Sequence, residues 1–264
     1  MLGVRRQTTA SSEMRLSACT IAISAILAAS AHADPNPVAS MTVQDFAAKW
    51  MMQQGDIAGT GVYASANAAL RASPVAEPRI VLMGDSITYH WTPALLPRLG
   101  SAAWVNRGIP GQNSSQMLLR FEGDVVALSP AVVVILAGTN DLRVYAGSHA
   151  DASPAILARL RSNVTAMSDI ADAREIRVVL SAIPPFDAPR DGDRRDPETW
   201  RAANAWLRTF AKARRYAFAD YSGLANAEGR LRADLSEDGL HPNPDGYMLM
   251  RSVLADAVKA MGVR

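Results

Sequence analysis

The sequence predicts an α/β fold in which one parallel β-sheet is covered by helices on both faces, a three-layer α/β/α sandwich. Three observations support this prediction. Short runs rich in β-branched residues alternate with longer segments of helical periodicity. Most of the short runs are almost entirely apolar, as strands buried on both faces are. Polar clusters follow three of them directly, where the loops of an open parallel sheet form ligand sites.

Five segments are expected to form the strands of the sheet. They are Arg79 to Met83, Ala103 to Asn106, Ala131 to Ala137, Ile176 to Ala182 and Tyr216 to Asp220. Apolar residues that recur at intervals of three and four predict helices between and after the later strands. These stripes are Ile156, Leu160, Val164, Met167 and Ile170, then Trp200, Ala203, Leu207 and Phe210, then Tyr247, Met250, Leu254, Val258 and Met261. The stretch from Pro184 to Pro197 is rich in proline and charge, which predicts a long exposed loop.

Residues 1–33 are expected to be an export signal. An apolar stretch follows Arg15, and residues 31–33 form an A-x-A cleavage pattern. Met14 suits the start of this signal better than Met1. The apolar stretch is shorter than the roughly 20 residues of a membrane span, so we expect no stable membrane anchor. These features predict an exported protein, either periplasmic or secreted.

The mature chain would begin with a leader and helical extension over residues 34–78, of which residues 41–72 are predicted to be helical. The main domain would follow over residues 79–264. Removal of residues 1–33 takes away the single cysteine, Cys19, so neither disulfides nor thiol chemistry is expected. It also leaves 24 basic and 24 acidic residues. This balance argues against nucleic acid as a partner.

The stretch VLMGDSITYHW, residues 81–91, carries the first candidate for catalysis. Its apolar run breaks into Gly-Asp-Ser, and Ser86 is either a helix N-cap or a nucleophile. A nucleophilic serine needs a base, and two histidines compete for this role. His90 would share a helix face with Ser86, whereas His241 lies at a distance in the chain.

Four blocks of sequence together resemble the SGNH (GDSL-type) esterase and lipase family, over about residues 79–260. The blocks are Gly84-Asp85-Ser86, Asn106-Arg107-Gly108-Ile109-Pro110-Gly111, Gly138-Thr139-Asn140-Asp141 and Asp238-Gly239-Leu240-His241-Pro242. The resemblance implies a flavodoxin-like five-stranded sheet, for which we expect the strand order 2-1-3-4-5. It also implies that Ser86 is the nucleophile, that Asp238 and His241 complete a triad, and that no cofactor is needed.

The same resemblance assigns the oxyanion hole to the N–H groups of Ser86 and Gly111 and to the side chain of Asn140. Gly111, and not Gly108, aligns with the oxyanion glycine of the family. The chemistry agrees with the triad, because a serine nucleophile needs a base and a carboxylate that fixes the tautomer of that base. Asp238 and His241 are close enough in sequence for the carboxylate to reach Nδ1 within one turn.

His90 lacks such a carboxylate, so we expect it to line the pocket or to play a structural part. His149 is expected to face solvent. Tyr89 and Trp91 are candidates either for a pocket wall or for the core. Asn106 and Arg107 are expected to support or line the pocket.

Asp85 and Asp141 could suggest a glycosidase with two carboxylates, but we expect both to bind loop backbone. Thr88 stands where a G-x-S-x-G elbow would need glycine, so the α/β-hydrolase pattern is not met. No H-E-x-x-H motif occurs, and no metal is expected; His241 with Asp245 is the one pair considered for an ion.

The sequence therefore predicts an exported serine esterase acting on a small-molecule, glycan or lipid ester. Acetylated carbohydrate, short-chain esters and lysophospholipids are the substrates considered. An O-acyltransferase acting on an envelope glycan is the alternative enzyme, and a glycan-binding module that retains the fold is the alternative without catalysis. The oligomeric state is left open.

Overall fold

The computed structural model describes residues 55–73, 77–145, 152–187 and 193–263. All of them belong to one of the two units into which the chain divides, Gly55–Arg264. The expected export signal, the leader up to residue 54 and His149 lie outside the described residues. Within the described ranges, no helix combines the length and the apolar character needed to pass through a lipid bilayer.

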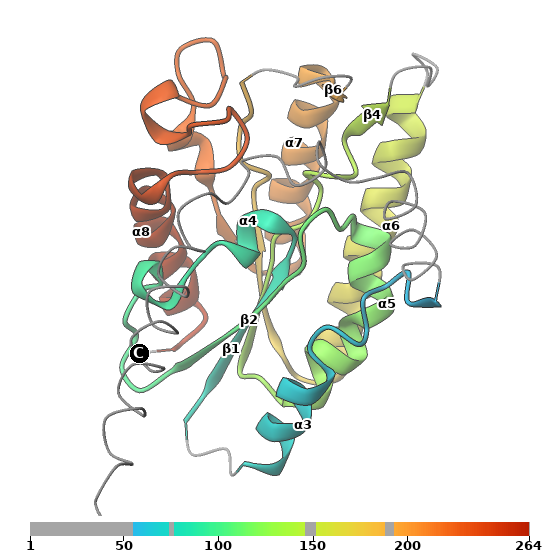
Figure 1. Cartoon of the computed structure of the whole chain (residues 1–264), viewed down its shortest axis with the longest axis vertical. Coiled ribbons are helices and arrows are strands. Elements are labelled where there is room, and N and C mark those ends of the chain that lie inside the picture. Colours follow the sequence, from blue (N-terminus) through green and yellow to red (C-terminus); the bar gives the residue numbers. More distant parts are fainter. Residues whose placement is uncertain (1–54, 74–76, 146–151, 188–192, 264) are drawn as a thin grey trace, which may run out of the picture. The chain divides into compact units, whose positions relative to one another are not determined.

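A five-stranded sheet with the order β2-β1-β3-β5-β7 lies at the centre of this unit (Figure 1). Its strands are β1 Arg79–Gly84, β2 Ala103–Gly108, β3 Val132–Ile135, β5 Arg177–Ser181 and β7 Ala217–Ala219. All neighbouring strands in it are parallel. Counted along the chain, the order is 2-1-3-4-5, which confirms the predicted fold class and strand order.

Helices cover both faces of the sheet. They are α5 Ser114–Asp124, α6 Ala152–Ala173 and α7 Pro197–Arg214 on one face and α8 Pro244–Ala260 on the other. Figure 1 shows α8 on one side of β1 and β2, with α5 and α6 on the opposite side. Along β1, Val81 and Met83 pack toward α5 and α6, whereas Ile80 and Leu82 pack toward α8. Burial on both faces explains why the strand segments lack polar alternation.

Helix α5 was not among the predicted elements. It begins with a capping box, in which Asn113 Oδ1 accepts the backbone N–H of Gln116 and Gln116 Oε1 accepts the N–H of Asn113 at 3.1 Å. Its apolar core contacts come from Met117 and Phe121, four residues apart. The cap residue with glutamine three positions later was the sequence signal for this helix. The three predicted stripes are confirmed as the core-facing sides of α6, α7 and α8, apart from Met261, which lies just beyond the end of α8.

Two short strands that the sequence did not predict form a separate two-stranded sheet. Strand β4 Arg143–Tyr145 pairs antiparallel with β6 Asp193–Arg195, which lies inside the stretch expected to be an exposed loop. That expectation is therefore wrong in part. The remaining short helices are η1 Pro93–Leu95, η2 Val126–Leu128, η3 Tyr221–Leu224 and η4 Ala233–Leu235.

The described part of the N-terminal extension contains one helix, α3 Ala64–Ala72, preceded by turns. Asp56 closes these turns by accepting hydrogen bonds from the backbone N–H of Thr60 at 2.8 Å and of Gly61 at 2.7 Å. The prediction of helix over residues 41–72 is thus wrong just before Ala64, because these bonds hold the backbone in turns, and residues 41–54 lie outside the described residues. Helix α3 contacts α5 and η2.

Candidate active site

Ser86 lies where strand β1, which pairs with β2 and β3, passes into the short helix α4, Ser86–Tyr89. Asp85 is the N-cap of this helix, and its Oδ1 accepts a hydrogen bond of 2.9 Å from Ile87 N–H. The alternative that Ser86 is the helix N-cap is wrong, because Asp85 takes that position. Ser86 is instead the first helical residue, so its N–H has no acceptor within the helix.

Two glycines let α4 lie directly across the ends of β1 and β2. Gly84 and Gly108 are neighbours in the parallel register. A Cβ atom on Gly84 would lie 2.0 Å from Thr88 Oγ1, and one on Gly108 would lie 2.2 Å from the backbone nitrogen of Tyr89. Only a residue without a side chain permits such contacts. This packing fixes the height of Ser86 above the sheet.

His241 lies beside Ser86, although 155 residues separate the two in the chain. Its Nε2 is 2.9 Å from Ser86 Oγ, and its Nδ1 is 2.7 Å from Asp238 Oδ2. Asp238 Oδ1 accepts the backbone N–H of His241 at 2.7 Å and that of Leu240 at 2.9 Å. Ser236 Oγ donates to the carbonyl oxygen of His241 at 2.7 Å. The turn therefore holds His241 through both its backbone and its ring.

Asp238 is stabilised in its ionised form. Burial raises its pKa, but hydrogen bonds from the His241 ring and from the N–H groups of His241 and Leu240 outweigh burial and lower the pKa to about 2. Because a carboxylate accepts only, the proton of a neutral His241 ring is assigned to Nδ1. Nε2 is then an acceptor facing the hydroxyl of Ser86, which is the arrangement needed to remove its proton.

His90 lies next to this chain of hydrogen bonds. Its ring centroid is 5.7 Å from that of His241, with the two rings edge to face. Burial, and then the neighbouring His241, lowers the pKa of His90, so its neutral form predominates at pH 7. The backbone N–H of His90 donates to the carbonyl oxygen of Ser86 at 3.0 Å, but among the described residues no hydrogen bond joins the side chains of His90 and Ser86. The structure thus brings His241 to Ser86 and places His90 in the wall of a neighbouring cavity.

This cavity has a volume of about 390 Å³ and adjoins the His241 ring. Its lining residues are His90, Leu95, Glu237, Asp238, His241, Pro242, Asn243, Pro244 and Tyr247. Two of these have their polar groups engaged elsewhere. Asn243 caps α8 by accepting the N–H of Gly246 at 3.0 Å, and the Tyr247 hydroxyl donates to the carbonyl oxygen of Ile87 at 2.7 Å. His90 and Glu237 are the exposed polar side chains of the wall.

Two glycines, Gly108 at the end of β2 and Gly111 in the loop that follows, are the candidate donors of a backbone N–H group from this part of the chain. Asn106 Oδ1 already accepts the N–H of Gly108 at 2.8 Å. The N–H of Gly111 has no acceptor among the described residues, and no atom of a residue other than its chain neighbours lies within 4 Å of where its Cβ would be. Gly111 adopts a φ of 79°, a backbone conformation that favours glycine. The geometry therefore leaves Gly111 as the available donor.

Asn140 supplies a third N–H group, at the end of β3. Its Nδ2 donates to the carbonyl oxygen of Gln112 at 3.0 Å, and its other contact is 3.4 Å from Asp85 Oδ2, at the limit of a hydrogen bond. The side chain of Asn140 thus links the loops that follow β1, β2 and β3. The three predicted oxyanion donors, Ser86, Gly111 and Asn140, thus follow the ends of β1, β2 and β3, and their joint action on a charged oxygen stays a prediction.

The carboxylates of Asp85 and Asp141 are almost completely buried, at 0% and 1% exposure. Burial raises the pKa of Asp85 to about 6 and also raises the pKa of Asp141. Asp141 accepts the backbone N–H of Ser114 at 2.8 Å and its hydroxyl at 2.5 Å, which ties the loop after β3 to the start of α5. Both carboxylates therefore bind the protein's own groups and are not open to a sugar.

Asn106 and Arg107, expected as supporting or pocket residues, contact other parts of the protein. Asn106 Nδ2 donates to the carbonyl oxygen of Thr88 at 2.6 Å, so it holds α4 against β2. Arg107 Nε donates to Asn67 Oδ1 at 2.8 Å, and its guanidinium lies 4.6 Å from the centre of the Tyr63 ring. Asn106 thus supports α4, whereas Arg107 binds the N-terminal extension.

Trp91 is part of the core, because it is only 1% exposed and packs between Tyr221 and Tyr247. Tyr89 is half exposed. The part of the chain that the structure describes holds no cluster of three or more His, Cys, Asp or Glu side chains arranged for a metal ion. Two residues that contact the loops of the site were missed in the sequence, Gln112 and Arg120. They have no motif of their own, and Arg120 lies on the helix that was not predicted.

Known proteins resemble this chain in sequence and in fold. The profile of the GDSL-like Lipase/Acylhydrolase family matches residues 82–249. No curated protein matches the chain. A GDSL-like lipase from Bacteroides thetaiotaomicron has 33% sequence identity and a TM-score of 0.67, covering 77% of this chain and 98% of its own. A candidate acylhydrolase from Bacteroides fragilis has 32% identity and a TM-score of 0.66, covering 78% of this chain and 97% of its own.

A more distant structure shares the fold. The acetyl xylan esterase AlAXEase has 20% identity and a TM-score of 0.56, over 68% of this chain and 99% of its own. At this level of identity the likeness concerns the fold alone. The two Bacteroides proteins, by contrast, resemble this chain in sequence as well as in fold.

Proposed function

The chain belongs to the GDSL-like lipase/acylhydrolase family, and from this premise we propose that it is a serine carboxyl-ester hydrolase that forms an acyl-enzyme on Ser86. One observation carries the proposal: an unbroken line of hydrogen bonds from Asp238 through His241 to Ser86, with lengths of 2.7 and 2.9 Å. Such a line supports removal of the serine proton by a correctly oriented neutral imidazole.

In the first half of the reaction, Ser86 Oγ attacks the acyl carbon while His241 Nε2 takes its proton. The carbonyl oxygen gains negative charge, which the N–H groups of Ser86, Gly111 and Asn140 would stabilise. Asp238 stabilises the imidazolium that forms. His241 then returns the proton to the alcohol oxygen as the bond between acyl carbon and alcohol breaks. In the second half, water attacks the acyl-enzyme by the same route and releases the acid.

The position of the cavity beside His241 indicates that the cavity binds the alcohol part of the ester and not the acyl part. Because His241 must protonate the departing oxygen, the alcohol lies on the side of this ring. The cavity of about 390 Å³ adjoins it there, and the exposed His90 and Glu237 offer hydrogen bonds. We therefore propose an alcohol with free hydroxyl groups, such as a sugar carrying a short acyl group. The carboxylate of Glu237 disfavours an anionic alcohol such as a phosphate-bearing one.

The first experiment measures turnover of p-nitrophenyl acetate by the purified protein and by Ser86→Ala. The variant should show no turnover and no covalent labelling by a fluorophosphonate, because both require the serine oxygen. Turnover retained by Ser86→Ala would refute the proposal. A panel of acyl chains from acetate to palmitate, followed by acetylated sugars and a lysophospholipid, then identifies the substrate class.

The histidines provide a second test. His241→Ala should remove nearly all turnover of p-nitrophenyl acetate, since no other base bonds to Ser86 among the described residues. His90→Ala should remain active on this small ester but lose activity toward an acetylated sugar, whose alcohol reaches the cavity. The opposite pattern between the two variants would show that His90 is the base.

We also propose that the protein is exported, with residues 1–33 removed. An A-x-A pattern at residues 31–33 supports this proposal. Mass spectrometry of the protein made in a bacterial host should find a chain that begins at Asp34 in the periplasm or the medium. A full-length chain retained in the cytoplasm would contradict it.

A further inference from the structure

Gln112 follows Gly111 directly, and its polar groups are hydrogen-bonded in three directions. Its Oε1 accepts from Arg120 Nε at 2.6 Å, and its Nε2 donates to the carbonyl oxygen of Ala58 at 2.6 Å. Its own carbonyl oxygen accepts from Asn140 Nδ2 at 3.0 Å. The residue is only 4% exposed. Gln112 therefore connects two of the three candidate oxyanion donors to the protein interior.

Arg120 extends this connection to the third donor. Its guanidinium is almost completely buried and donates to Gln112 Oε1, to Asp124 Oδ2 at 2.8 Å and to the carbonyl oxygen of Gly84 at 3.0 Å. Gly84 precedes Ser86 by two residues. Because the guanidinium is planar and rigid, it fixes the relative positions of its three acceptors. One side chain thus links the end of β1 to the loop after β2.

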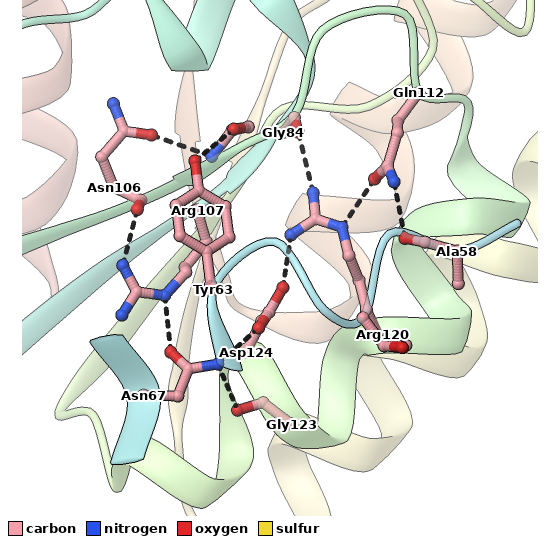
Figure 2. A network of polar contacts seen from close by, with 12 residues as sticks. Ala58, Tyr63, Asn67, Gly84, Asn106, Arg107, Gln112, Arg120, Gly123 and Asp124 are labelled. Atoms are coloured by element: carbon pink, nitrogen blue, oxygen red, sulfur yellow. Dashed lines mark hydrogen bonds and ion pairs between the residues drawn. The ribbon is translucent and has the colours of Figure 1, made fainter. Parts of the chain in front are cut away.

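Residues of the N-terminal extension also contact this network of hydrogen bonds around Gln112 and Arg120. Figure 2 shows the carbonyl group of Ala58 facing Gln112, Asn67 facing Asp124, and the Tyr63 ring beside Arg107. The Tyr63 hydroxyl donates to the carbonyl oxygen of Gly108 at 2.5 Å, and Asn67 Nδ2 donates to Asp124 Oδ1 at 2.6 Å. The extension therefore holds both ends of the loop that carries Gly111.

We propose that Gln112 and Arg120 are positioning residues that, held by residues 56–67, set the separation between the N–H of Ser86 and the N–H of Gly111. This inference rests on the proposed function. Oxyanion donors act only at about 2.7–3.1 Å from the charged oxygen, and an error of about 1 Å can cost about 100-fold in rate. The oxygen becomes charged only in the transition state, so the loss falls on kcat and not on KM.

Two variants of Gln112 distinguish the contributions of its two side-chain hydrogen bonds, to Arg120 and to Ala58. Gln112→Leu is of similar size and removes both side-chain bonds. Gln112→Glu keeps an acceptor for Arg120 but loses the donor to Ala58. With p-nitrophenyl acetate, Gln112→Leu should lower kcat by about 100-fold at unchanged KM, and Gln112→Glu should lie between it and the unaltered protein. All rates are divided by the number of sites that a fluorophosphonate labels, so that unfolded chains do not count.

Inhibition by a trifluoromethyl ketone provides a second measurement, which a general loss of stability of the fold would not change. The ketone adds to the serine as a tetrahedral oxyanion, so its inhibition constant should rise by the same factor by which kcat falls. Arg79→Met is the matched control, because Arg79 is also buried and donates to the carbonyl oxygens of Leu128 at 2.9 Å and Leu70 at 2.7 Å. These bonds tie α3 to the other end of β1. The control should lower Tm while kcat for each labelled site stays unchanged.

The outcomes separate this inference from the function on which it rests. Unchanged kcat and unchanged inhibition in Gln112→Leu would overturn the positioning role while leaving the esterase intact. An equal fall of kcat in Arg79→Met would overturn it as well, because the effect would then come from general destabilisation. Absence of turnover in the unaltered protein would overturn the proposed function, and the inference with it.

Discussion

Replacement of Asp238 by asparagine is the sharpest test of the hydrogen-bonded line at the site. Asp238 Oδ1 accepts two backbone N–H groups, at 2.7 and 2.9 Å, while Oδ2 faces His241 Nδ1. The amide oxygen of the asparagine must take the place of Oδ1, because an NH2 group there would oppose two donors. Each unsatisfied donor costs about 1–3 kcal/mol, so the flipped side chain is rare.

The amide nitrogen of Asp238→Asn then donates to His241 Nδ1, which moves the ring proton to Nε2. A protonated Nε2 cannot accept the proton of Ser86, so kcat should fall about 10⁴-fold, equivalent to about 5.5 kcal/mol in the barrier. The assay is p-nitrophenyl acetate turnover for each folded molecule, with folding checked by circular dichroism. Asp234→Asn is the control, since Asp234 is an exposed carboxylate in the same segment that pairs with Arg232. A loss below 10-fold in Asp238→Asn would refute the assigned tautomer.

Three further predictions concern the oxyanion donors, packing and acid stability. Asn140→Ala should lower kcat by about 10²–10³-fold with little change in KM. Gly108→Ala should lower the free energy of unfolding by about 3 kcal/mol, because its Cβ would lie 2.2 Å from the backbone nitrogen of Tyr89; Gly123→Ala, in open space on α5, should raise it by up to about 1 kcal/mol. Urea unfolding measures both. The pKa of Asp238 is lower in the folded state, so its stabilising contribution is present above its unfolded value of 3.8 and is lost as pH falls through about 2. Urea unfolding at pH 4 and pH 2 should show a loss of about 1–2 kcal/mol attributable to this partly exposed group, absent in Asp238→Asn.

The sheet could be predicted from the sequence because each of its strands carries its own signal. Segments such as Arg79–Gly84 are apolar and β-branched, and helices α6, α7 and α8 have a clear apolar stripe. The spacing of Asp238 and His241 within one turn also allowed their contact to be predicted. In each case, neighbouring residues in the sequence determine the feature.

Features that depend on distant partners could not be predicted in this way. Helix α5 was missed because its buried face contains Arg120 and Asp124, an ion pair that interrupts the apolar stripe. Strands β4 and β6 are short and exist only as a pair from different parts of the chain. Asp85 and Ser86 are both good N-cap residues, and the end of β1 at Gly84 decides between them.

The long separation of Ser86 and His241 in the chain makes turnover a reporter of complete folding. The nucleophile follows the first strand of the sheet, at the start of α4, whereas its base precedes the last helix, α8. Helix α8 is tied to α4 through the bond from Tyr247 to the carbonyl oxygen of Ile87. A refolding intermediate that has formed the sheet but has not docked α8 contains the serine without its base. The rate at which ester cleavage recovers after dilution from urea therefore reports the docking of α8. The rate of change in circular dichroism reports the earlier formation of helices and strands.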